Sequence, residues 1–376
     1  MVKRGFTVTA PAFLLLEDGS IFSGNAFGFS TQEIGEVVFN TTMTGYQEVL
    51  TDPSYSGQIV VLTYPLVGNY GINDQHSESG RAQVSGFVVR EQCETPSNGT
   101  STETLHEFLV SQQIPGIYGV DTRAITKRLR SQGVMMGVLT HGPIDAAKRA
   151  LGSATRYDDV DFIKVVTTNK EYRWGVLAGD KVARYRVLVY DYGLKYNILR
   201  LLESRGCEVL VVPAETPAKE MLNANIDGIL LSPGPGDPLL LDYLVENTKT
   251  LLGQIPIMGI CLGHQIAARA LGAKTFKLKF GHRGGNHPVK DLDTGRIFIT
   301  SQNHGYAIDA STLDDGCKVS HVNLNDNTVE GLIHSQIPLI SIQYHSEASP
   351  GPRDNEYMFD RFLGLMEAHK IGKGGM

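Results

Sequence analysis

The chain has 376 residues, of which 41% are hydrophobic and 20% are charged. This length exceeds one ordinary core, and the composition excludes both a disulfide-stapled miniprotein and a wholly disordered chain. The net charge of −6 gives no basic field for nucleic acid or an anionic membrane, so we expect small molecules or another protein as partners.

The first apolar run predicts a strand rather than a targeting segment. Ala12 to Leu16 is shorter than the core of a signal peptide, and Glu17, Asp18 and Gly19 follow at once as a turn. No window approaches the ~20 apolar residues that a membrane span needs. The four cysteines include no C-x-x-C pair, which favours a reducing compartment. We therefore expect a cytoplasmic protein.

The first half of the chain is rich in predicted strands. Short β-rich runs from residue 11 to about 95 are separated by Gly, Asn, Asp and Pro. Apolar residues at helical spacing then predict helices over 102–112 and 121–132, the second with an Asp cap. We assign residues 1–150 to an N-terminal β-rich α/β domain.

A polar, irregular stretch follows, and we place a linker at residues 151–184. It contains the only tryptophan, Trp174. An amphipathic ring in a linker more often docks the segment onto a neighbouring domain than binds a ligand. We therefore expect Trp174 to pack against one of the two domains.

The second half, residues 185–376, alternates strands and helices. Near-continuous apolar strands separated by helices are typical of a mostly parallel sheet covered on both faces, with ligands at the carboxyl ends of the strands. The expected strands are 185–190, 208–213, 227–231 and 255–260, and the expected helices begin near residues 194, 217, 238 and 263.

The clearest motif follows the strand at 255–260. The sequence GICLG at 259–263 has the form of a G-x-nucleophile-x-G elbow, with Cys261 in place of serine. Glycines on both sides let the strained backbone lie close to adjacent strands, and the helix N-terminus favours thiolate over thiol. Cys261 is therefore predicted to be an activated nucleophile rather than a buried structural cysteine.

A thiolate nucleophile needs a base, and the base needs an orienting group. The strand predicted at 338–344 leads into His345 and, two residues later, Glu347. Two residues of extended chain put both side chains on the same side. We expect His345 to pair with Cys261 and Glu347 to fix the imidazole tautomer.

Acyl transfer also needs donors for an oxyanion. The N–H of Leu262, directly after the nucleophile, is one candidate, and the loop at 232–238 (SPGPGDP) is another. This loop lacks the Gly-Lys-Ser/Thr of a phosphate loop, and Leu239 stands where a dinucleotide fingerprint would have its third glycine.

These residues resemble the class I (triad) glutamine amidotransferases. The first half, which most amidotransferases lack, makes the chain similar to the family of small, glutamine-hydrolysing subunits of carbamoyl phosphate synthetase. The motifs that carry the resemblance are GICLGHQ (259–265), SPGPGDP (232–238), the His345-x-Glu347 pair, SQNHGY (301–306), FGHRGGNHPVKDL (280–292), YDYGLKYNILR (190–200), GEVVFNTTMTGYQEVLTDPSYSGQIV (35–60) and GIYGVDTRAITKRLR (116–130).

The resemblance implies a triad of Cys261, His345 and Glu347. It also implies that backbone groups dominate the recognition of L-glutamine. The family commonly has Pro where Ser346 stands and often Asn where Pro233 stands, and the first difference bears on how tightly Glu347 is held. The implied glutamine-binding residues are Ser54, Gly234, Gly236, Leu262, Gln265, Asn303, Gly305 and Tyr306.

The resemblance further implies a partner, the large subunit that makes carbamoyl phosphate from bicarbonate for pyrimidine and arginine synthesis. No ATP site is apparent in this chain, so we expect no cofactor here, and ATP and Mg²⁺ only in the partner. His282 and His287 lack nearby ligands that would complete a metal set, and we predict no metal site.

Two other functions remain open from the residues alone. A different cysteine hydrolase, for instance one that cleaves γ-glutamyl peptides, would need no synthetase partner. A non-catalytic binding or regulatory module would keep the fold and lack a reactive thiol.

Overall fold

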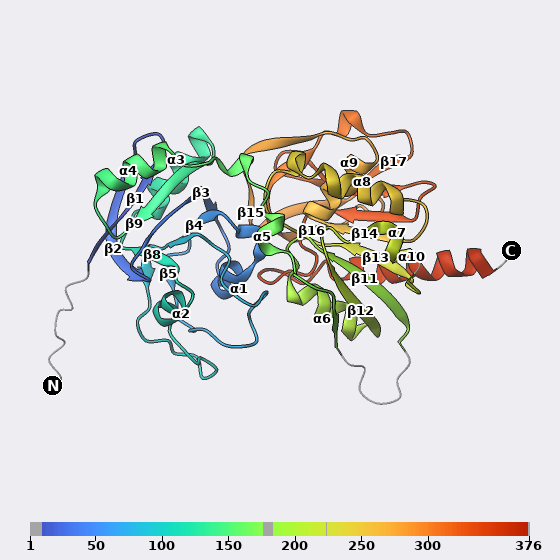
Figure 1. The fold of residues 1–376 in the computed structure, drawn as a ribbon, viewed down its shortest axis with the longest axis horizontal. Helices are drawn as coiled ribbons and strands as arrows, with labels where there is room; N and C mark the ends of the chain where they lie inside the picture. Colours follow the sequence, from blue (N-terminus) through green and yellow to red (C-terminus); the bar gives the residue numbers. More distant parts are fainter. Residues whose placement is uncertain (1–9, 176–182, 223, 375–376) are drawn as a thin grey trace.

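The computed structural model describes residues 10–175, 183–222 and 224–374. Two bodies lie side by side, with the N-terminal half of the chain on the left of Figure 1 and the C-terminal half on the right. Residues 1–9 of the predicted first domain and 176–182 of the predicted linker lie outside the described residues. The proposed bounds of 1–150, 151–184 and 185–376 stay a prediction.

The first body is a closed barrel. Its strands follow the order β1-β2-β8-β6-β4-β3-β9. Alternate residues of β3 enter two different cores, because Val37 and Phe39 pack with one cluster and Val38 with another. The strands are β1 (Pro11–Leu16), β2 (Ile21–Gly28), β3 (Gln32–Asn40), β4 (Gln58–Leu62), β6 (Gly86–Val88), β8 (Pro115–Tyr118) and β9 (Met135–Thr140), and a separate pair is β5 (Leu66–Val67) and β7 (Glu91–Gln92).

Helices pack around the barrel, and both helices predicted here are confirmed. Thr104 and Glu107 form a capping box at the start of α2, and Asp121 accepts a hydrogen bond from the Ala124 N–H at the start of α3. These caps satisfy N–H groups that a helix start leaves unpaired. The helices are α1 (Tyr46–Thr51), α2 (Leu105–Ser111), α3 (Thr122–Gln132) and α4 (Ile144–Gly152), with a 3₁₀ turn, η1, at Pro53–Tyr55.

The second body is built on a ten-stranded sheet in the order β10-β12-β11-β13-β14-β19-β18-β17-β15-β16. Strands β12, β11, β13, β14 and β19 pair in parallel, as predicted. The sheet then continues through antiparallel strands that the sequence analysis did not single out. The strands are β11 (Tyr185–Asp191), β12 (Cys207–Pro213), β13 (Gly228–Leu231), β14 (Ile257–Ile260), β15 (Thr275–Asp291), β16 (Ile297–Ile308), β17 (Cys317–Asn323), β18 (Val329–His334) and β19 (Leu339–Ile342).

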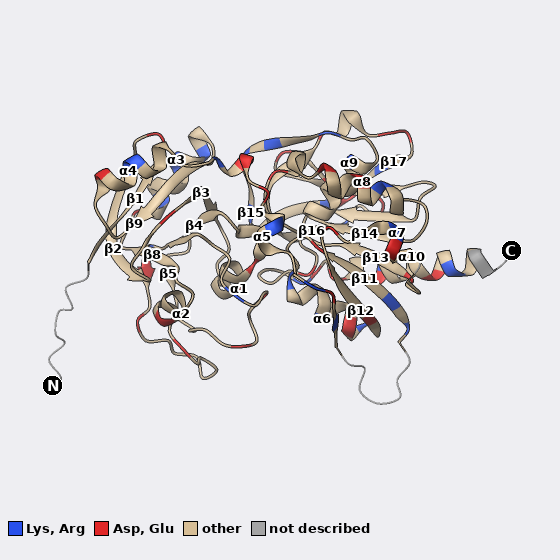
Figure 2. Ribbon diagram, viewed as in Figure 1, with Lys and Arg blue, Asp and Glu red and all other residues tan. Residues whose placement is uncertain are grey.

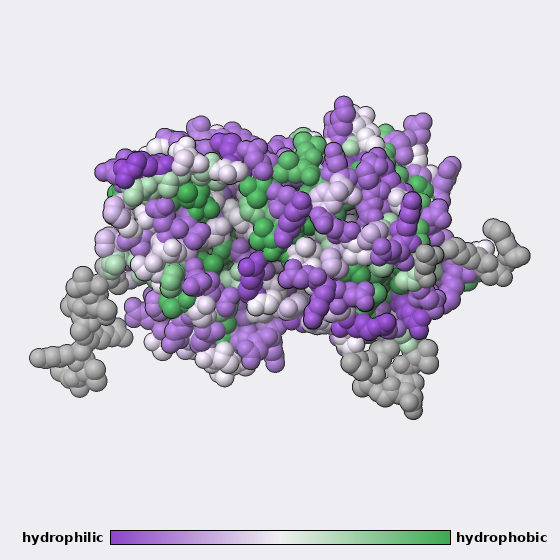
Figure 3. Space-filling model, in the orientation of Figure 1, coloured by the Kyte–Doolittle hydropathy of each residue, from purple (hydrophilic) through white to green (hydrophobic). Residues whose placement is uncertain are grey.

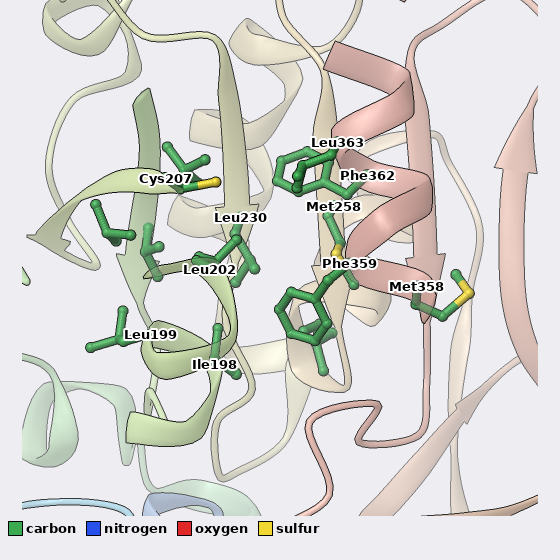
Figure 4. Packing of buried hydrophobic residues seen from close by; sticks show 14 of the residues in the cluster. Ile198, Leu199, Leu202, Cys207, Leu230, Met258, Met358, Phe359, Phe362 and Leu363 are labelled. Carbon is green, nitrogen blue, oxygen red and sulfur yellow. The ribbon is translucent and has the colours of Figure 1, made fainter. Parts of the chain in front are cut away.

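Helices cover both faces of the parallel strands, which confirms the α/β class. On one face, Phe359 and Phe362 of α10 pack beside Met258 of β14, with α6 next to them (Figure 4). Helices α7, α8 and α9 form the other face around Leu188 and Tyr190 of β11. Their bounds are α6 (Tyr196–Ser204), α7 (Ala218–Met221), α8 (Asp242–Leu251, after a 3₁₀ turn η3 at Pro238–Leu240), α9 (Leu262–Ala270) and α10 (Tyr357–Gly374).

The segment between the bodies contains η2 (Tyr157–Asp159), α5 (Ile163–Val166) and β10 (Tyr172–Trp174). Strand β10 pairs antiparallel with β12. The indole N–H of Trp174 donates to Glu203, and its ring lies 5.2 Å from that of Tyr196. Trp174 therefore docks the linker onto the second body, as predicted.

The surface carries mixed charge. Lys and Arg are interspersed with Asp and Glu over both bodies in Figure 2, and the face in Figure 3 is mostly hydrophilic with small apolar areas. No helix in the described part of the chain has the length and apolar character needed to cross a membrane.

Candidate active site

Cys261 lies at the tight turn between β14 and α9. Its φ of 52° and ψ of −106° are unusual for a residue with a side chain, and such strain is typical of functional turns. A Cβ on Gly259 would lie 2.7 Å from the Gly263 carbonyl oxygen, and a Cβ on Gly263 would collide with the Leu231 backbone. The two glycines therefore permit the close packing that the predicted elbow requires.

Parallel pairing brings His345 to Cys261. Ile260 of β14 lies beside Ile342 of β19, so both chains leave the sheet at the same edge. Both side chains are buried, and the Cys261 thiol donates to the Asn303 carbonyl at 3.7 Å. Among the described residues, His345 Nε2 has no hydrogen-bond partner, which leaves it available to exchange a proton with the thiol.

Glu347 orients the His345 ring. Its Oε1 lies 2.6 Å from His345 Nδ1, which favours the tautomer with hydrogen on Nδ1. Burial by itself lowers the pKa of His345, but the nearby Glu347 carboxylate outweighs burial and raises it to about 10. The structure therefore pairs His345 with Glu347 and favours the protonated imidazole, and it places Cys261 at the same edge of the sheet.

Lys195 completes this group, and the sequence analysis gave it no role. Its Nζ donates to Glu347 Oε1 at 3.0 Å and to the Ala348 carbonyl at 2.5 Å, and its side chain is only 2% exposed. Burial alone would raise the pKa of Glu347, but Lys195 and His345 lower it to about 2. The only sequence signal was a lysine just after the carboxyl end of β11, inside a motif already quoted for the resemblance.

The serine at position 346 raises the question of what holds Glu347 in place. Ser346 is fully buried between His345 and Glu347. The family's usual proline would restrict this backbone, whereas serine leaves it freer. Here one oxygen of the Glu347 carboxylate, Oε1, contacts both His345 and Lys195, whereas Oε2 is buried with no hydrogen-bond partner among the described residues.

A small pocket lies beside the nucleophile, between the two bodies. The N–H of Leu262, the first residue of α9, has no acceptor within its own helix and is placed directly after the nucleophile. His345 and Glu347 lie outside the pocket lining. The predicted residues that line the pocket are Cys261, Ser54, Gly234, Gly236, Gln265, Asn303, Gly305 and Tyr306.

The first body reaches this pocket through the turn that contains Ser54. Asp52 Oδ1 accepts from the Ser54 N–H at 2.9 Å, and Asp52 Oδ2 accepts from Asn303 Nδ2 of β16 at 3.0 Å. The Ser54 hydroxyl is buried and has no partner among the described residues. Asp52 therefore ties together two predicted glutamine-binding residues from different bodies, although the sequence analysis did not identify it.

Three more charged residues line the pocket and were also missed: Glu36, Lys277 and Arg283. Lys277 Nζ contacts Glu36 Oε1 at 2.9 Å. The Arg283 Nε is buried without a partner among the described residues. These residues lie on strands β3 and β15, far apart in the sequence, so only the packing of the two bodies brings them together.

One buried group near the pocket has the composition of a metal site: His282, His304 and Glu330. Its potential ligand atoms already make hydrogen bonds. His304 contacts the Tyr306 carbonyl and Gln302 through its two ring nitrogens, and Glu330 accepts from Gln302. We interpret the group as a hydrogen-bond network that supports β16. The rings of His282 and His287 lie 5.1 Å apart, and His282 Nε2 lies 2.8 Å from Asp326 Oδ2, so the expectation that no potential ligand lies near these histidines was wrong.

Comparisons with known proteins match both bodies. Residues 14–139 match the family described as carbamoyl-phosphate synthase small chain, CPSase domain, and residues 188–365 match glutamine amidotransferase class-I. A carbamoyl phosphate synthase small chain of Akkermansia muciniphila is 53% identical over 366 residues, covering 96% of this chain and 98% of the relative. That of Syntrophotalea carbinolica is 50% identical over 378 residues, covering 96% and 100%.

These matches agree with the geometry. The first matched region spans the barrel and the second spans the sheet with its elbow, while the relatives extend over nearly the whole chain. The chloroplastic carbamoyl phosphate synthase small chain of Oryza sativa is also 46% identical over 370 residues, 96% of this chain and 83% of the relative. The chain therefore belongs to the carbamoyl phosphate synthase small-chain family, as a glutamine-hydrolysing small subunit with a class I glutamine amidotransferase domain.

Proposed function

We propose that the chain hydrolyses L-glutamine through a thioester on Cys261 and delivers the ammonia to a large synthetase subunit. The main support is the elbow cysteine at the sheet edge where His345 and Glu347 lie 2.6 Å apart. The predicted glutamine-binding residues around the same pocket add to it.

The chemistry follows from the protonation states. The Cys261 thiolate attacks the side-chain amide carbon of glutamine, and the N–H of Leu262 and the Gly234 loop stabilise the oxyanion. His345 donates its proton to the departing ammonia. It then removes a proton from water, which cleaves the thioester and releases glutamate.

Ammonia that escapes into neutral water becomes ammonium, which is not a nucleophile. A shielded transfer to a partner therefore makes the hydrolysis useful for synthesis. The relatives are named small chains of carbamoyl phosphate synthase, which supports a large-chain partner. We infer from the family resemblance that this partner uses ATP and Mg²⁺ to make carbamoyl phosphate from bicarbonate, for pyrimidine and arginine synthesis. This chain would need no cofactor of its own.

The test is Cys261→Ala in the complex with the large subunit. We expect glutaminase activity to be abolished and ammonia-driven carbamoyl phosphate synthesis to be retained. Cys207→Ala is the control, because Cys207 is equally buried but lies in the core of the sheet, away from the pocket. Glutaminase activity that survives in Cys261→Ala would contradict the proposal.

A further inference from the structure

The glutamine pocket is nearly filled in this structure. Its volume is about 20 Å³. One water molecule needs roughly 10–15 Å³ of such space. A glutamine molecule, with its amide, its methylene groups and its α-amino-acid end, is several times larger. Some part of the pocket wall must therefore move before the substrate can reach Cys261.

Part of the wall comes from a linker segment, residues 156–162, which we call the linker strap. Tyr157 of this strap is buried, and its hydroxyl accepts from the Gly236 N–H at 3.0 Å. Its ring stacks on Phe162 of the same strap, with centroids 4.8 Å apart. Tyr157 thus contacts a predicted glutamine-binding residue directly.

Asp158, the next residue of the strap, contacts two residues of the pocket wall, Lys277 and Tyr306. Its carboxylate contacts Lys277 Nζ at 2.6 and 2.8 Å and accepts from the Tyr306 hydroxyl at 2.8 Å. Burial opposes ionisation of Asp158, but the hydrogen bonds from Lys277 and Tyr306 outweigh it and lower its pKa. Lys277 also pairs with Glu36 of the barrel, so the strap joins both bodies over the pocket.

A second, larger cavity lies behind the strap. Its volume is about 550 Å³, and its lining includes Gly57, Ser85 and Phe162. Tyr157 lines both this outer cavity and the small pocket. It therefore forms part of the wall between them, and its withdrawal would add the space that glutamine needs.

We propose that the linker strap is a gate, and that L-glutamine enters the pocket from the outer cavity when Tyr157 and Asp158 withdraw. The closed strap and bound glutamine exclude each other, so the apparent affinity for glutamine depends on the fraction of molecules that are open. The identity of the ligand rests on the proposed function, whereas the gate itself concerns access to the Cys261 thiol.

Alkylation of Cys261 by iodoacetamide measures that access without any glutamine hydrolysis. The experiment uses the full chain, alone and with its large subunit, and mass spectrometry separates Cys261 from the partly exposed Cys93 and Cys317. Asp158→Asn and Tyr157→Phe each weaken strap contacts and leave the triad intact. Asp159→Asn is the matched control, because this neighbour on the same 3₁₀ turn is exposed.

We expect iodoacetamide to alkylate Cys261 faster in Asp158→Asn and in Tyr157→Phe than in the control, by about two- to tenfold for each hydrogen bond lost. We also expect the KM for glutamine to fall, because the closed form competes with substrate. Alkylation rates equal to the control would overturn the gate. A rise in KM would also overturn it, since Asp158 would then contact the substrate itself. If the unsubstituted complex failed to hydrolyse glutamine while the variants still differed in their alkylation rates, the proposed function would be refuted and the gate would stand.

Discussion

The two bodies contribute to the site in different ways. The sheet supplies the reacting groups, because Cys261, His345 and Lys195 all follow the carboxyl ends of parallel strands and are nearly inaccessible to solvent. The barrel supplies part of the pocket wall, through Ser54 and Glu36. Strand order within one body thus sets the reaction, whereas packing between two bodies sets the access and fit of the substrate.

The largest effect is expected inside the sheet, from Glu347→Gln. Removing the carboxylate charge leaves burial and Lys195 to lower the pKa of His345 from about 10. The imidazolium is then lost at a lower pH, so the alkaline limb of the pH profile of glutaminase kcat should move to lower pH. We expect kcat at neutral pH to fall by about 10²–10⁴-fold.

Glu330→Gln is the control for this substitution. Glu330 is equally buried and hydrogen-bonded in the same sheet, but it does not contact His345. We expect it to change stability while the alkaline limb stays in place. An unshifted alkaline limb in Glu347→Gln would mean that Glu347 does not set the protonation of His345.

Lys195→Met tests whether the reacting groups depend on a buried cation. The substitution leaves Glu347 buried without its lysine, and breaking a buried ion pair costs about 3–5 kcal/mol. Lys195 helps to lower the pKa of Glu347 to about 2, so in the variant this pKa should rise. The stability that comes from ionised Glu347 would then be lost at a higher pH as the solution is acidified.

Urea unfolding at several pH values measures this effect. Lys249→Met is the control, because Lys249 pairs with Glu246 on the exposed face of α8 and such pairs contribute about 0–1 kcal/mol. A loss of less than 1 kcal/mol in Lys195→Met would show that the triad carboxylate does not need this cation.

The smallest effect is expected at the contact between the bodies, from Asp52→Ala. This change removes the acceptor of both the Ser54 N–H and Asn303, and each such bond contributes about 0.5–1.5 kcal/mol. We expect KM for glutamine to rise about tenfold while kcat changes little. Asp309→Ala, which removes a similar cap at an exposed 3₁₀ turn, should leave KM unchanged. If Asp52→Ala lowered kcat and left KM unchanged, the contact between the bodies would act on the reaction rather than on substrate binding, contrary to this comparison.

Local sequence was sufficient to identify the elbow and to predict a triad. Gly259 and Gly263 mark a turn that admits no side chain, and Cys261 between them follows an apolar strand. His345 and Glu347 lie close together as predicted, but the predicted reason was wrong: β19 ends at Ile342, and the Ala348 N–H donates to the His345 carbonyl at 3.1 Å, so a turn rather than extended chain brings the two side chains together. Patterns of this kind depend only on neighbours in the sequence.

The antiparallel half of the sheet was harder to predict from local patterns. Strand β15 contains Gly284, Gly285 and Pro288, which normally argue against a strand, and its pairing with β16 shows register shifts. The two glycines lie at the register shift between Gly284 and His287, whereas Pro288 pairs in regular register with Ile299. Long-range partners therefore override the local preference.

The sequence by itself determined the class of fold and predicted the nucleophile, its base and the orienting carboxylate, because each depends on spacing along one strand and its following turn. Only the tertiary structure decided that Lys195 contacts Glu347, that Asp52 joins Ser54 to Asn303, and that Tyr157 and Asp158 contact residues of the pocket wall. These contacts join segments up to 251 positions apart. Charge and hydrogen bonding act through space, so no local pattern in one sequence records them.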